Sequence, residues 1–251
     1  MVKKKIIALI PARSGSVRIK NKNILKINDH PLIAYTITSA INSKLFSKIV
    51  VSTDSTNYKK IAEYYGAKVP FLMPINISKS TSSDYEWVNY TLKGIEENFD
   101  YFYILRPTNP SRTSKTILRS WNLFKTNKYR YSVRGVTLTK NHPAKMWYKI
   151  GKFIRPVLKG KYKKQPYYNS QFTVLPKIYQ QNACIEISKT DVVKKYHTIT
   201  SKKILPFVMN EIESHDINYK EDFTNINLNK IEKITKKPFK TFKYKWQKII
   251  K

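Results

Sequence analysis

The stretch that decides the fold lies near the start of the chain and reads Lys4-Lys5-Ile6-Ile7-Ala8-Leu9-Ile10-Pro11-Ala12, then Arg13-Ser14-Gly15-Ser16-Val17-Arg18-Ile19-Lys20-Asn21-Lys22-Asn23. Its first part is almost continuously apolar, which predicts a strand buried on both faces of a sheet. Its second part is polar and basic, which predicts a loop at the carboxyl end of that strand. Open α/β sheets bind their ligands at this edge, so the loop is the first candidate for a binding site.

The segments that follow repeat the order of strand, loop and helix. Further strands are predicted over residues 47–53, 67–72, 100–105, 182–188 and 203–211, and helices over residues 31–43, 56–65, 82–98, 113–125 and 219–236. Pro31 suits the first turn of its helix, and Gly66 suits the position just after a helix end. This alternation predicts an α/β fold with a mostly parallel sheet and helices on both faces.

Residues 140–180 interrupt this pattern and are predicted to form a small β-rich lobe inserted in a single domain of residues 1–251. The features that end regular elements are Pro143, Gly151, Pro156, Gly160, Pro166 and Pro176, and the aromatic residues are Trp147, Tyr148, Phe153, Tyr162, Tyr167, Tyr168 and Phe172. Aromatic surface is costly to leave in water, which favours a lobe that packs on a second subunit in a homodimer. A long surface loop is the alternative. Residues 237–251 form a basic tail.

The composition excludes several classes of protein. The chain has 251 residues and is 41% hydrophobic, which is enough for one large domain with a buried core. No window approaches about 20 consecutive apolar residues, so no transmembrane helix is expected. The basic and apolar start leads into Pro11 without a small-residue cleavage site, which favours a core strand over a signal peptide. The one cysteine, Cys184, cannot form an internal disulfide, and this predicts a cytoplasmic protein.

The net charge of +32 comes from 48 Lys and Arg against 16 Asp and Glu. One interpretation is a protein that binds nucleic acid or an anionic membrane. However, only 8 of the 48 basic residues are Arg, the residue best suited to bidentate recognition of phosphate and bases. A lysine excess spread over the whole chain favours a drift in surface composition, so neither nucleic acid nor a membrane is predicted as a partner.

The basic loop of residues 13–23 predicts an anion site. Gly15 allows backbone N–H groups to approach an anion closely, and the surrounding cations are Arg13, Arg18, Lys20 and Lys22. The loop contains neither G-x-x-x-x-G-K-[ST] nor G-x-G-x-x-G, so it is not a common phosphate-binding motif. A solvated basic loop with a turn glycine is the alternative interpretation.

Asp216 and Asn218 form a candidate metal site. In an extended segment, residues i and i+2 project to one face, which places two oxygen ligands side by side. Mg²⁺ takes such oxygen ligands together with waters and phosphate oxygens. An Asx turn that ends a strand is the alternative. The four histidines lack metal-ligand spacing, and Cys184 is expected to be a buried, inert thiol.

Eight segments in the same order carry a resemblance to a known family. They are Pro11-Ala12-Arg13-x-Gly15-Ser16 with Lys22-Asn23, Val51-Ser52-Thr53-Asp54-Ser55, Pro70-Phe71-Leu72-x-Pro74, Thr81-Ser82-Ser83, Leu105-Arg106-Pro107-Thr108-Asn109-Pro110-Ser111-Arg112-Thr113, His142-Pro143-Ala144-Lys145-Met146-Trp147, Leu175-Pro176-x-x-Tyr179-x-x-Asn182-Ala183 and Glu213-Ser214-x-Asp216-Ile217-Asn218-x-x-x-Asp222-Phe223. The chain resembles the acylneuraminate cytidylyltransferases, which activate nine-carbon sugar acids of the sialic, legionaminic and pseudaminic types. The resemblance covers residues 4–226.

This resemblance implies a Rossmann-like nucleotidyltransferase fold and a reaction that uses CTP and Mg²⁺. The anomeric hydroxyl of the sugar acid attacks the α-phosphorus of CTP, and pyrophosphate leaves. Fixed cations that stabilise the charge developing on pyrophosphate lower the barrier. The resemblance assigns catalytic roles to Arg13, Lys22 and Asp216, and metal binding to Asp216 and Asn218. It implies nucleotide binding by Ala12, Arg13, Gly15, Ser16, Lys22, Asn23, Ser82 and Arg106, and binding of the sugar carboxylate by Lys145. The arginine usual before Leu175 is missing, and Gln171 is the nearest polar candidate. Gln180 and Asn182, just before a predicted strand, are candidates to hydrogen-bond sugar hydroxyls.

The chain departs from the family pattern at several of these places. Asn218 replaces a second aspartate, which leaves the group that deprotonates the sugar hydroxyl unassigned. Met73 replaces an arginine, Arg106 replaces a glutamine, and Ala183 replaces a glycine. Ser80 stands where an acidic residue is usual. The alternatives are therefore an eight-carbon sugar acid or another nucleotide on the same fold, an inactive relative, or a basic nucleic-acid-binding protein.

Overall fold

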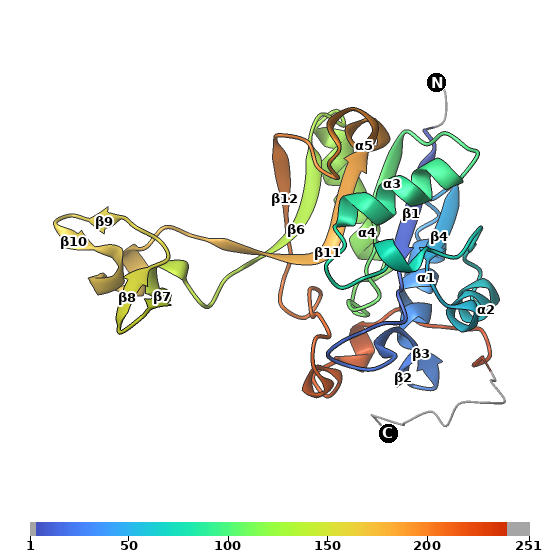
Figure 1. The fold of residues 1–251 in the computed structure, drawn as a ribbon, viewed down its shortest axis with the longest axis horizontal. Coiled ribbons are helices and arrows are strands. Elements are labelled where there is room, and N and C mark those ends of the chain that lie inside the picture. The colour runs from blue at the N-terminus through green and yellow to red at the C-terminus, as the bar shows by residue number, and fades with distance from the viewer. Residues whose placement is uncertain (1–3, 240–251) are drawn as a thin grey trace.

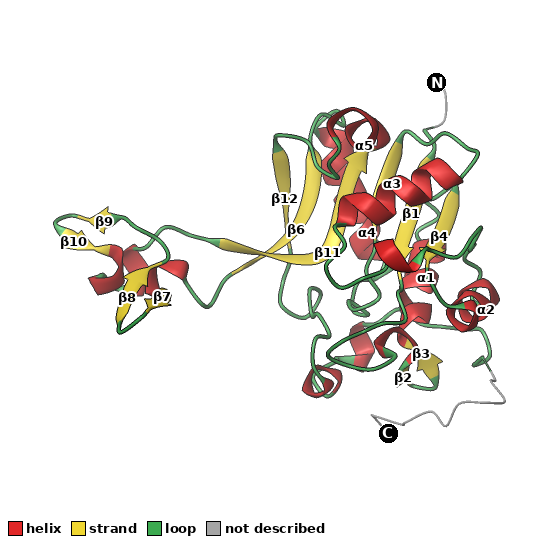
Figure 2. Ribbon diagram, viewed as in Figure 1, coloured by secondary structure: helices red, strands yellow, loops and turns green. Residues whose placement is uncertain are grey.

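Within residues 4–239, the part of the chain that this computed structural model describes, six strands form one central sheet. Their order across the sheet is β12 (Ile204–Val208), β6 (Ser132–Leu138), β11 (Tyr179–Lys189), β5 (Tyr101–Ile104), β1 (Ile6–Pro11) and β4 (Lys48–Ser52). The pairs β1–β4, β1–β5 and β6–β12 are parallel, whereas β11 runs antiparallel to β5 and β6. The predicted mostly parallel sheet is confirmed (Figure 1, Figure 2).

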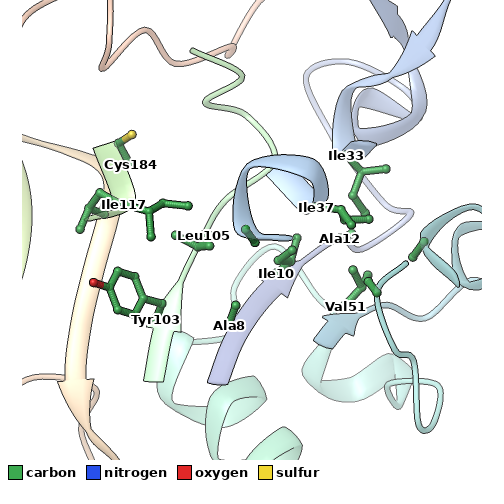
Figure 3. Close-up of a cluster of buried hydrophobic side chains, with 14 of the residues drawn as sticks. Ala8, Ile10, Ala12, Ile33, Ile37, Val51, Tyr103, Leu105, Ile117 and Cys184 are labelled. Atoms are coloured by element: carbon green, nitrogen blue, oxygen red, sulfur yellow. The ribbon is translucent and has the colours of Figure 1, made fainter. Parts of the chain in front are cut away.

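Helices cover both faces of this sheet. They are α1 (Leu32–Asn42), α2 (Thr56–Tyr64), α3 (Asp84–Gly94), α4 (Ser114–Thr126) and α5 (Thr190–Tyr196). Ala8 and Ile10 of β1 lie in one apolar cluster with side chains of α1, α2 and α4 (Figure 3). Ile7 and Leu9 lie in a second cluster with side chains of α3 and α5. Strand β1 is therefore buried on both sides, because its successive side chains enter opposite clusters.

The helix ends follow local signals in the sequence. Ser55 caps α2, since its hydroxyl accepts a hydrogen bond from the N–H of Tyr58, and Gly66 follows the helix with a φ of +102°. Ser83 and Glu86 form a reciprocal capping box at the start of α3. None of the helices in residues 4–239 has the length and apolar character that a membrane crossing demands.

A small lobe projects from the body of the molecule on the extended ends of β6 and β11 (Figure 1). It contains two antiparallel ribbons, one of β7 (Trp147–Ile150) and β8 (Phe153–Pro156), the other of β9 (Lys161–Tyr162) and β10 (Gln165–Pro166). These ribbons lie in the segment for which the sequence predicts a β-rich lobe. A shorter ribbon in the body pairs β2 (Lys26–Ile27) with β3 (His30–Pro31).

The predicted closing helix over residues 219–236 is wrong. Two short 3-10 turns, Lys220–Phe223 and Leu228–Lys230, occupy this segment. Asp222 accepts hydrogen bonds from the N–H groups of Asn218 and Tyr219, and Asn227 accepts one from the N–H of Asn229. Asp and Asn side chains thus hold the backbone in turns, which explains why the helical pattern fails here.

Two further predictions need correction or fall outside the structure. The predicted strand over residues 67–72 is reduced to a single parallel bridge between Val50 and Lys68, because Pro70 cannot donate to a ladder. The predicted basic tail of residues 237–251 lies outside the described residues from position 240 onward. Its first part packs on α2, where the Phe239 ring contacts the Tyr64 ring with centroids 5.1 Å apart.

Strand β11 contains a bulge beside Gly135 of β6. The register shifts between Gln181 and Glu186, so the intervening residues of β11 lie opposite Gly135. Ala183 adopts a φ of +53°, a conformation that favours glycine. A Cβ atom on Gly135 would lie 2.5 Å from the Oδ1 atom of Asn182. The bulge therefore holds Ala183 in a backbone conformation that glycine adopts without strain.

Replacing Ala183 by glycine should stabilise the protein. The change relieves left-handed strain at this position, which outweighs the entropy that glycine adds to the unfolded chain, and we expect a gain of about 0.5–1 kcal/mol in the free energy of unfolding. The urea midpoint measures this effect. Gly135→Ala is the matched variant and should lower the midpoint, because its methyl group collides with Asn182. A lower midpoint for Ala183→Gly would contradict the bulge geometry.

Candidate active site

A cleft of about 610 Å³ opens beyond the carboxyl ends of the parallel strands β1, β4 and β5. Its walls come from the loops that follow these strands and from the start of α3. They are lined by Pro11, Arg13, Ser16, Val17, Arg18, Ile19, Lys22, Asn23, Ser52, Thr53, Met73, Ile77, Ser78, Lys79, Ser80, Ser82, Asp84, Trp87, Arg106, Pro107, Thr108 and Asn218. This is the edge at which open α/β sheets bind ligands.

The basic loop after β1 is anchored at its start by Asp54. The Asp54 carboxylate accepts hydrogen bonds from the Ser14 N–H at 2.7 Å and from the Ser14 hydroxyl at 3.0 Å. Among the described residues, none forms a hydrogen bond or ion pair with the Arg13 guanidinium, which lines the cleft. Gly15 is exposed, and a Cβ atom there would meet nothing within 4 Å. Asp54 therefore fixes the start of the loop, while the Arg13 guanidinium has no partner among the described residues.

Lys22 and Arg18 join this loop to the segment of residues 216–218. The Lys22 ammonium donates to the Ile217 carbonyl at 2.7 Å, and Arg18 Nη1 donates to Asn218 Oδ1 at 2.7 Å. The Arg18 guanidinium also lies 5.5 Å from the Tyr219 ring centroid. Partial burial lowers the pKa of Lys22 below its usual value, and the attraction of Asp216 only partly offsets this. The two segments with candidate catalytic residues thus share one cleft.

Asp216 and Asn218 lie side by side, as predicted, although their segment is irregular rather than a strand. The Asn218 amide nitrogen donates to Asp216 Oδ2 at 2.7 Å, and Ile217 between them is fully buried on the opposite side. Asp216 Oδ1 is buried and has no hydrogen-bond partner within the described chain. A buried carboxylate oxygen without a partner is costly unless a cation binds it.

The residues present fit a Mg²⁺ ion that takes most of its ligands from elsewhere. In the described chain, no group of three or more His, Cys, Asp and Glu side chains could hold a metal. Asp216 Oδ1 offers one hard ligand, and the Asn218 amide oxygen would be a second if it released its hydrogen bond from Arg18. Mg²⁺ is commonly bound by one or two carboxylates together with waters and substrate phosphates.

Arg106 is held by two acids that the sequence interpretation did not assign to the site. Arg106 Nη2 donates to Asp84 at 2.6 Å and to Glu186 at 3.0 Å. Burial opposes the charge of Arg106, but the two carboxylates raise its pKa above the usual value. Burial also opposes the charge of Asp84, but the Arg106 guanidinium holds the pKa of this carboxyl below its usual value. Asp84 could be identified only as a helix-cap residue. Glu186 carried a signal, because an acid within a buried strand needs a partner.

The predicted site residues fall into three groups: those that line the cleft, those near lining residues in sequence, and the sugar-binding residues outside the cleft. Those that line the cleft are Arg13, Ser16, Lys22, Asn23, Ser82, Arg106 and Asn218. Ala12 and Gly15 are sequence neighbours of lining residues, and Asp216, which does not line the cleft, lies two positions before Asn218. Ala12 is buried in the core, where its N–H donates to the Ser52 carbonyl, so it contributes no side chain to the walls (Figure 3).

The predicted sugar-binding residues lie outside the walls of the cleft. Lys145 belongs to the lobe, where its ammonium donates to the carbonyls of Tyr168 and Ser170. Gln171 is an exposed lobe residue, and Gln180 is an exposed residue of β11. The Asn182 side chain caps the Cys184 N–H within the bulge.

Cys184 is buried and inert, as predicted. Burial raises the pKa of its thiol to about 12, so the reactive thiolate is absent at neutral pH. The residue packs in the same cluster as Ile117 and Leu105 (Figure 3).

A cation-lined cleft at the carboxyl edge of a mostly parallel sheet defines an α/β protein of the nucleotide-binding class. Residues 7–245 match the family model described as cytidylyltransferase. The chain belongs to this family, whose members are nucleotidyltransferase enzymes.

Three relatives are similar over most of the chain. The N-acylneuraminate cytidylyltransferase of Escherichia coli O18:K1:H7 is 33% identical over 87% of this chain, which spans half of that relative. The post-translational flagellin modification protein B of Campylobacter coli is 33% identical over 87% of this chain and 92% of its own length. The CMP-N,N'-diacetyllegionaminic acid synthase of Legionella pneumophila is 31% identical over 85% of this chain and 90% of its own length.

Solved structures show the same fold at low identity. A CMP:2-keto-3-deoxy-manno-octonic acid synthetase complexed with CTP has a TM-score of 0.60 and 13% identity, over 82% of this chain and 90% of its own. The 4-diphosphocytidyl-2C-methyl-D-erythritol synthase of Anaerococcus prevotii has a TM-score of 0.61 and 13% identity, over 90% of this chain and 98% of its own. These likenesses support the α/β architecture.

The lowered pKa of Lys22 predicts a loss of CTP affinity in mildly alkaline solution. The charged ammonium attracts the triphosphate, and a lysine with a lowered pKa becomes neutral at a lower pH than an exposed lysine. If Lys22 binds the triphosphate, affinity should begin to fall at a lower pH than deprotonation of an exposed lysine would cause, and it should level off once Lys22 is neutral. Lys22→Arg should remove this decline, because arginine stays charged throughout.

Calorimetric titration with CTP between pH 7 and pH 10 measures this profile. Lys20→Arg, in the same loop but outside the cleft walls, is the control and should keep the wild-type profile. Identical profiles for the wild type and Lys22→Arg would show that Lys22 does not meet the triphosphate.

Proposed function

We propose that this enzyme transfers CMP from CTP to the anomeric hydroxyl of a nine-carbon sugar acid of the sialic, legionaminic or pseudaminic type, with release of pyrophosphate. The observation that carries the proposal is the cleft in which Arg13 and Lys22 meet the Asp216 segment. The relatives support the class of acceptor, since they include enzymes named for N-acylneuraminate, legionaminic acid and pseudaminic acid.

The loop cations would bind and orient the triphosphate. Arg13 has no protein partner among the described residues, so its guanidinium is available to phosphate oxygens, and Ser16 offers a hydroxyl on the same wall. Lys22 is fixed by the Ile217 carbonyl and can donate its remaining hydrogens to the leaving pyrophosphate. Cations that are already in place stabilise the charge that develops as pyrophosphate leaves, without reorganisation.

Asp216 and Asn218 would hold the Mg²⁺ ion that the family resemblance implies. When bound, the ion would neutralise phosphate charge and lower the pKa of a hydroxyl or water that it contacts. The neutral Asn218 amide cannot accept the proton of the sugar hydroxyl. The unpartnered Asp216 Oδ1 keeps acceptor capacity for a water or a cation.

The projecting lobe supports a homodimer. In the ribbon β7–β8, Ile150 pairs with Phe153 and Tyr148 with Arg155, so Tyr148, Ile150 and Phe153 share one face. Their exposed fractions are 59%, 49% and 67%, which leaves an apolar strip in solvent, with Arg155 beside it on the same face. A second copy of the chain would cover this strip. Lys145 lies in the same lobe, so a sugar carboxylate would meet the partner subunit's Lys145.

Two rival functions make different predictions. An eight-carbon sugar acid would be used in the same cleft, and a panel of acceptors would identify it. A nucleic-acid-binding protein would bind DNA or RNA with a steep salt dependence, whereas the enzyme binds CTP in a Mg²⁺-dependent way. The cytoplasmic location predicted from the single cysteine fits an enzyme that uses CTP.

Pyrophosphate release with CTP, Mg²⁺ and a mixture of sugar acids tests the proposed reaction. Arg13→Ala should lower kcat by about 10²–10³-fold, because it removes a fixed charge from the leaving group. Asp216→Ala should abolish the dependence of CTP binding on Mg²⁺. Lys20→Ala is the matched control and should retain activity. A wild-type protein without pyrophosphate release would rule out the reaction.

Light scattering tests the homodimer. Phe153→Glu with Ile150→Glu places two charges on the apolar strip and should convert the dimer into a monomer. Tyr196→Glu, at a site 68% exposed at the end of α5, is the control and should leave the dimer mass unchanged. A dimer that persists in the double variant would mean that this strip is not the interface.

A further inference from the structure

The projecting lobe carries positive charge that the protein does not balance. Residues 140–180 contain ten basic side chains and no aspartate or glutamate. Among the described residues, Lys140 pairs with Glu211 at 2.8 Å, and Lys145 is fixed by two lobe carbonyls. The other eight cations are exposed and form no ion pair or side-chain hydrogen bond within the part of the chain that the structure describes; they are Lys149, Lys152, Arg155, Lys159, Lys161, Lys163, Lys164 and Lys177.

Four of these eight cations gather in the ribbon β9–β10 at the far end of the lobe (Figure 1). Residues 159–164 read Lys-Gly-Lys-Tyr-Lys-Lys, and they include β9 and the turn that leads into β10. Tyr162 is 41% exposed, and the Lys163 ammonium lies 5.7 Å from the centroid of its ring. The ribbon therefore presents four lysines and an aromatic ring together in solvent.

The ribbon is fastened to the rest of the lobe at its base. The Tyr167 N–H donates to the Gly160 carbonyl at 2.9 Å. The Tyr167 ring also packs closely on Gly160, since a Cβ atom there would lie 2.1 Å from the ring carbon Cε2. The backbone that carries the lysines is thus ordered before any ligand arrives, which lowers the entropy cost of binding.

This ribbon is separate from the apolar strip proposed for the homodimer. That strip lies on β7–β8, whereas β9 and β10 form a sheet of their own. A second copy of the ribbon would bring the same four lysines, so contact between two such ribbons would be repulsive. The partner that suits the ribbon is therefore an anion of another kind.

An anionic lipid surface matches the ribbon better than a nucleic acid does. All four cations are lysines, which act as point charges, whereas nucleic-acid recognition favours the planar fork of arginine. Lysine stems and an amphipathic ring such as that of Tyr162 are suited to the boundary between headgroups and acyl chains. The ribbon lies at the end of a projecting lobe, so it can reach an extended surface without obstruction by the body (Figure 2).

We propose that the β9–β10 ribbon binds the anionic surface of a lipid bilayer through Lys159, Lys161, Lys163 and Lys164, with the Tyr162 ring at the level of the headgroups. The contact is peripheral and reversible. Each lysine strengthens binding about fivefold. The ribbon revises the expectation, drawn from the lysine excess alone, that a membrane is not a partner. The inference does not depend on the proposed reaction.

Co-sedimentation of the full chain with vesicles tests the inference. Vesicles of phosphatidylglycerol and phosphatidylcholine in equal parts should bind the wild-type protein, and vesicles of phosphatidylcholine alone should not. Added salt should release the protein, because it screens surface charges. Combining Lys159→Gln, Lys161→Gln, Lys163→Gln and Lys164→Gln should lower the partition coefficient about 100-fold or more. Tyr162→Ser should lower it by a smaller factor.

A matched variant separates the ribbon from net charge. Combining Lys115→Gln, Lys125→Gln, Lys202→Gln and Lys203→Gln removes the same charge from exposed sites on the body and should change vesicle binding less than about threefold. All of these side chains are exposed, so both variants should keep the wild-type melting temperature.

Three results would overturn the inference. They are equal losses of vesicle binding in the two fourfold variants, equal binding of the wild type to anionic and neutral vesicles, and a wild type that binds single-stranded RNA through the ribbon but does not sediment with vesicles. None of these results bears on pyrophosphate release, which tests the proposed reaction separately.

Discussion

The hydrogen bond from the Lys22 ammonium to the Ile217 carbonyl joins two segments that lie 195 residues apart, and the cleft depends on it. Lys22 follows the first strand, and Ile217 belongs to an irregular segment beyond the last strand of the sheet. Ile217 is fully buried, and its N–H donates to the Thr108 carbonyl after β5 at 2.9 Å. One residue therefore ties the loops after β1 and β5 to the Asp216 segment. The cations and the unpartnered carboxylate oxygen meet because of this junction.

The cleft separates two electrostatic environments. Near Arg13 and Lys22 positive charge is in excess, and partial burial makes the Lys22 ammonium easier to deprotonate. Near Arg106, by contrast, guanidinium and carboxylate charges cancel while donors remain. In the proposed reaction, the first environment would stabilise charge on the leaving group, because its cations are already in place.

The molecule also divides its tasks between the body and the lobe. The body contains the sheet and the cleft, whereas the lobe projects on the ends of β6 and β11 (Figure 1). Lys145 is committed to two lobe carbonyls in its own chain and lies away from its own cleft walls. Lys145 and the apolar residues of β7–β8 thus lie together in the lobe, apart from the cleft of their own chain.

Local patterns were sufficient for the first strand, its basic loop and the helices with clear caps. The run of residues 6–11 is buried on both faces, and Ser55, Ser83 and Gly66 mark helix ends, so each signal lies within a few residues of the element that it predicts. The same reasoning failed over residues 219–236. There Asp222 and Asn227 bond to nearby N–H groups, and these contacts outweigh the helical spacing of apolar residues.

The sequence by itself determined the α/β class, the family and the chemistry of the loop after β1, because these are written in adjacent residues. Only the tertiary structure decided which charges cancel and which remain free. Arg106 meets Glu186 across 80 positions, and Lys22 meets Ile217 across 195. Chain folding sets such distances, and local spacing does not record them. The free cation of Arg13, the balanced cation of Arg106 and the strain at Ala183 were therefore visible only in three dimensions.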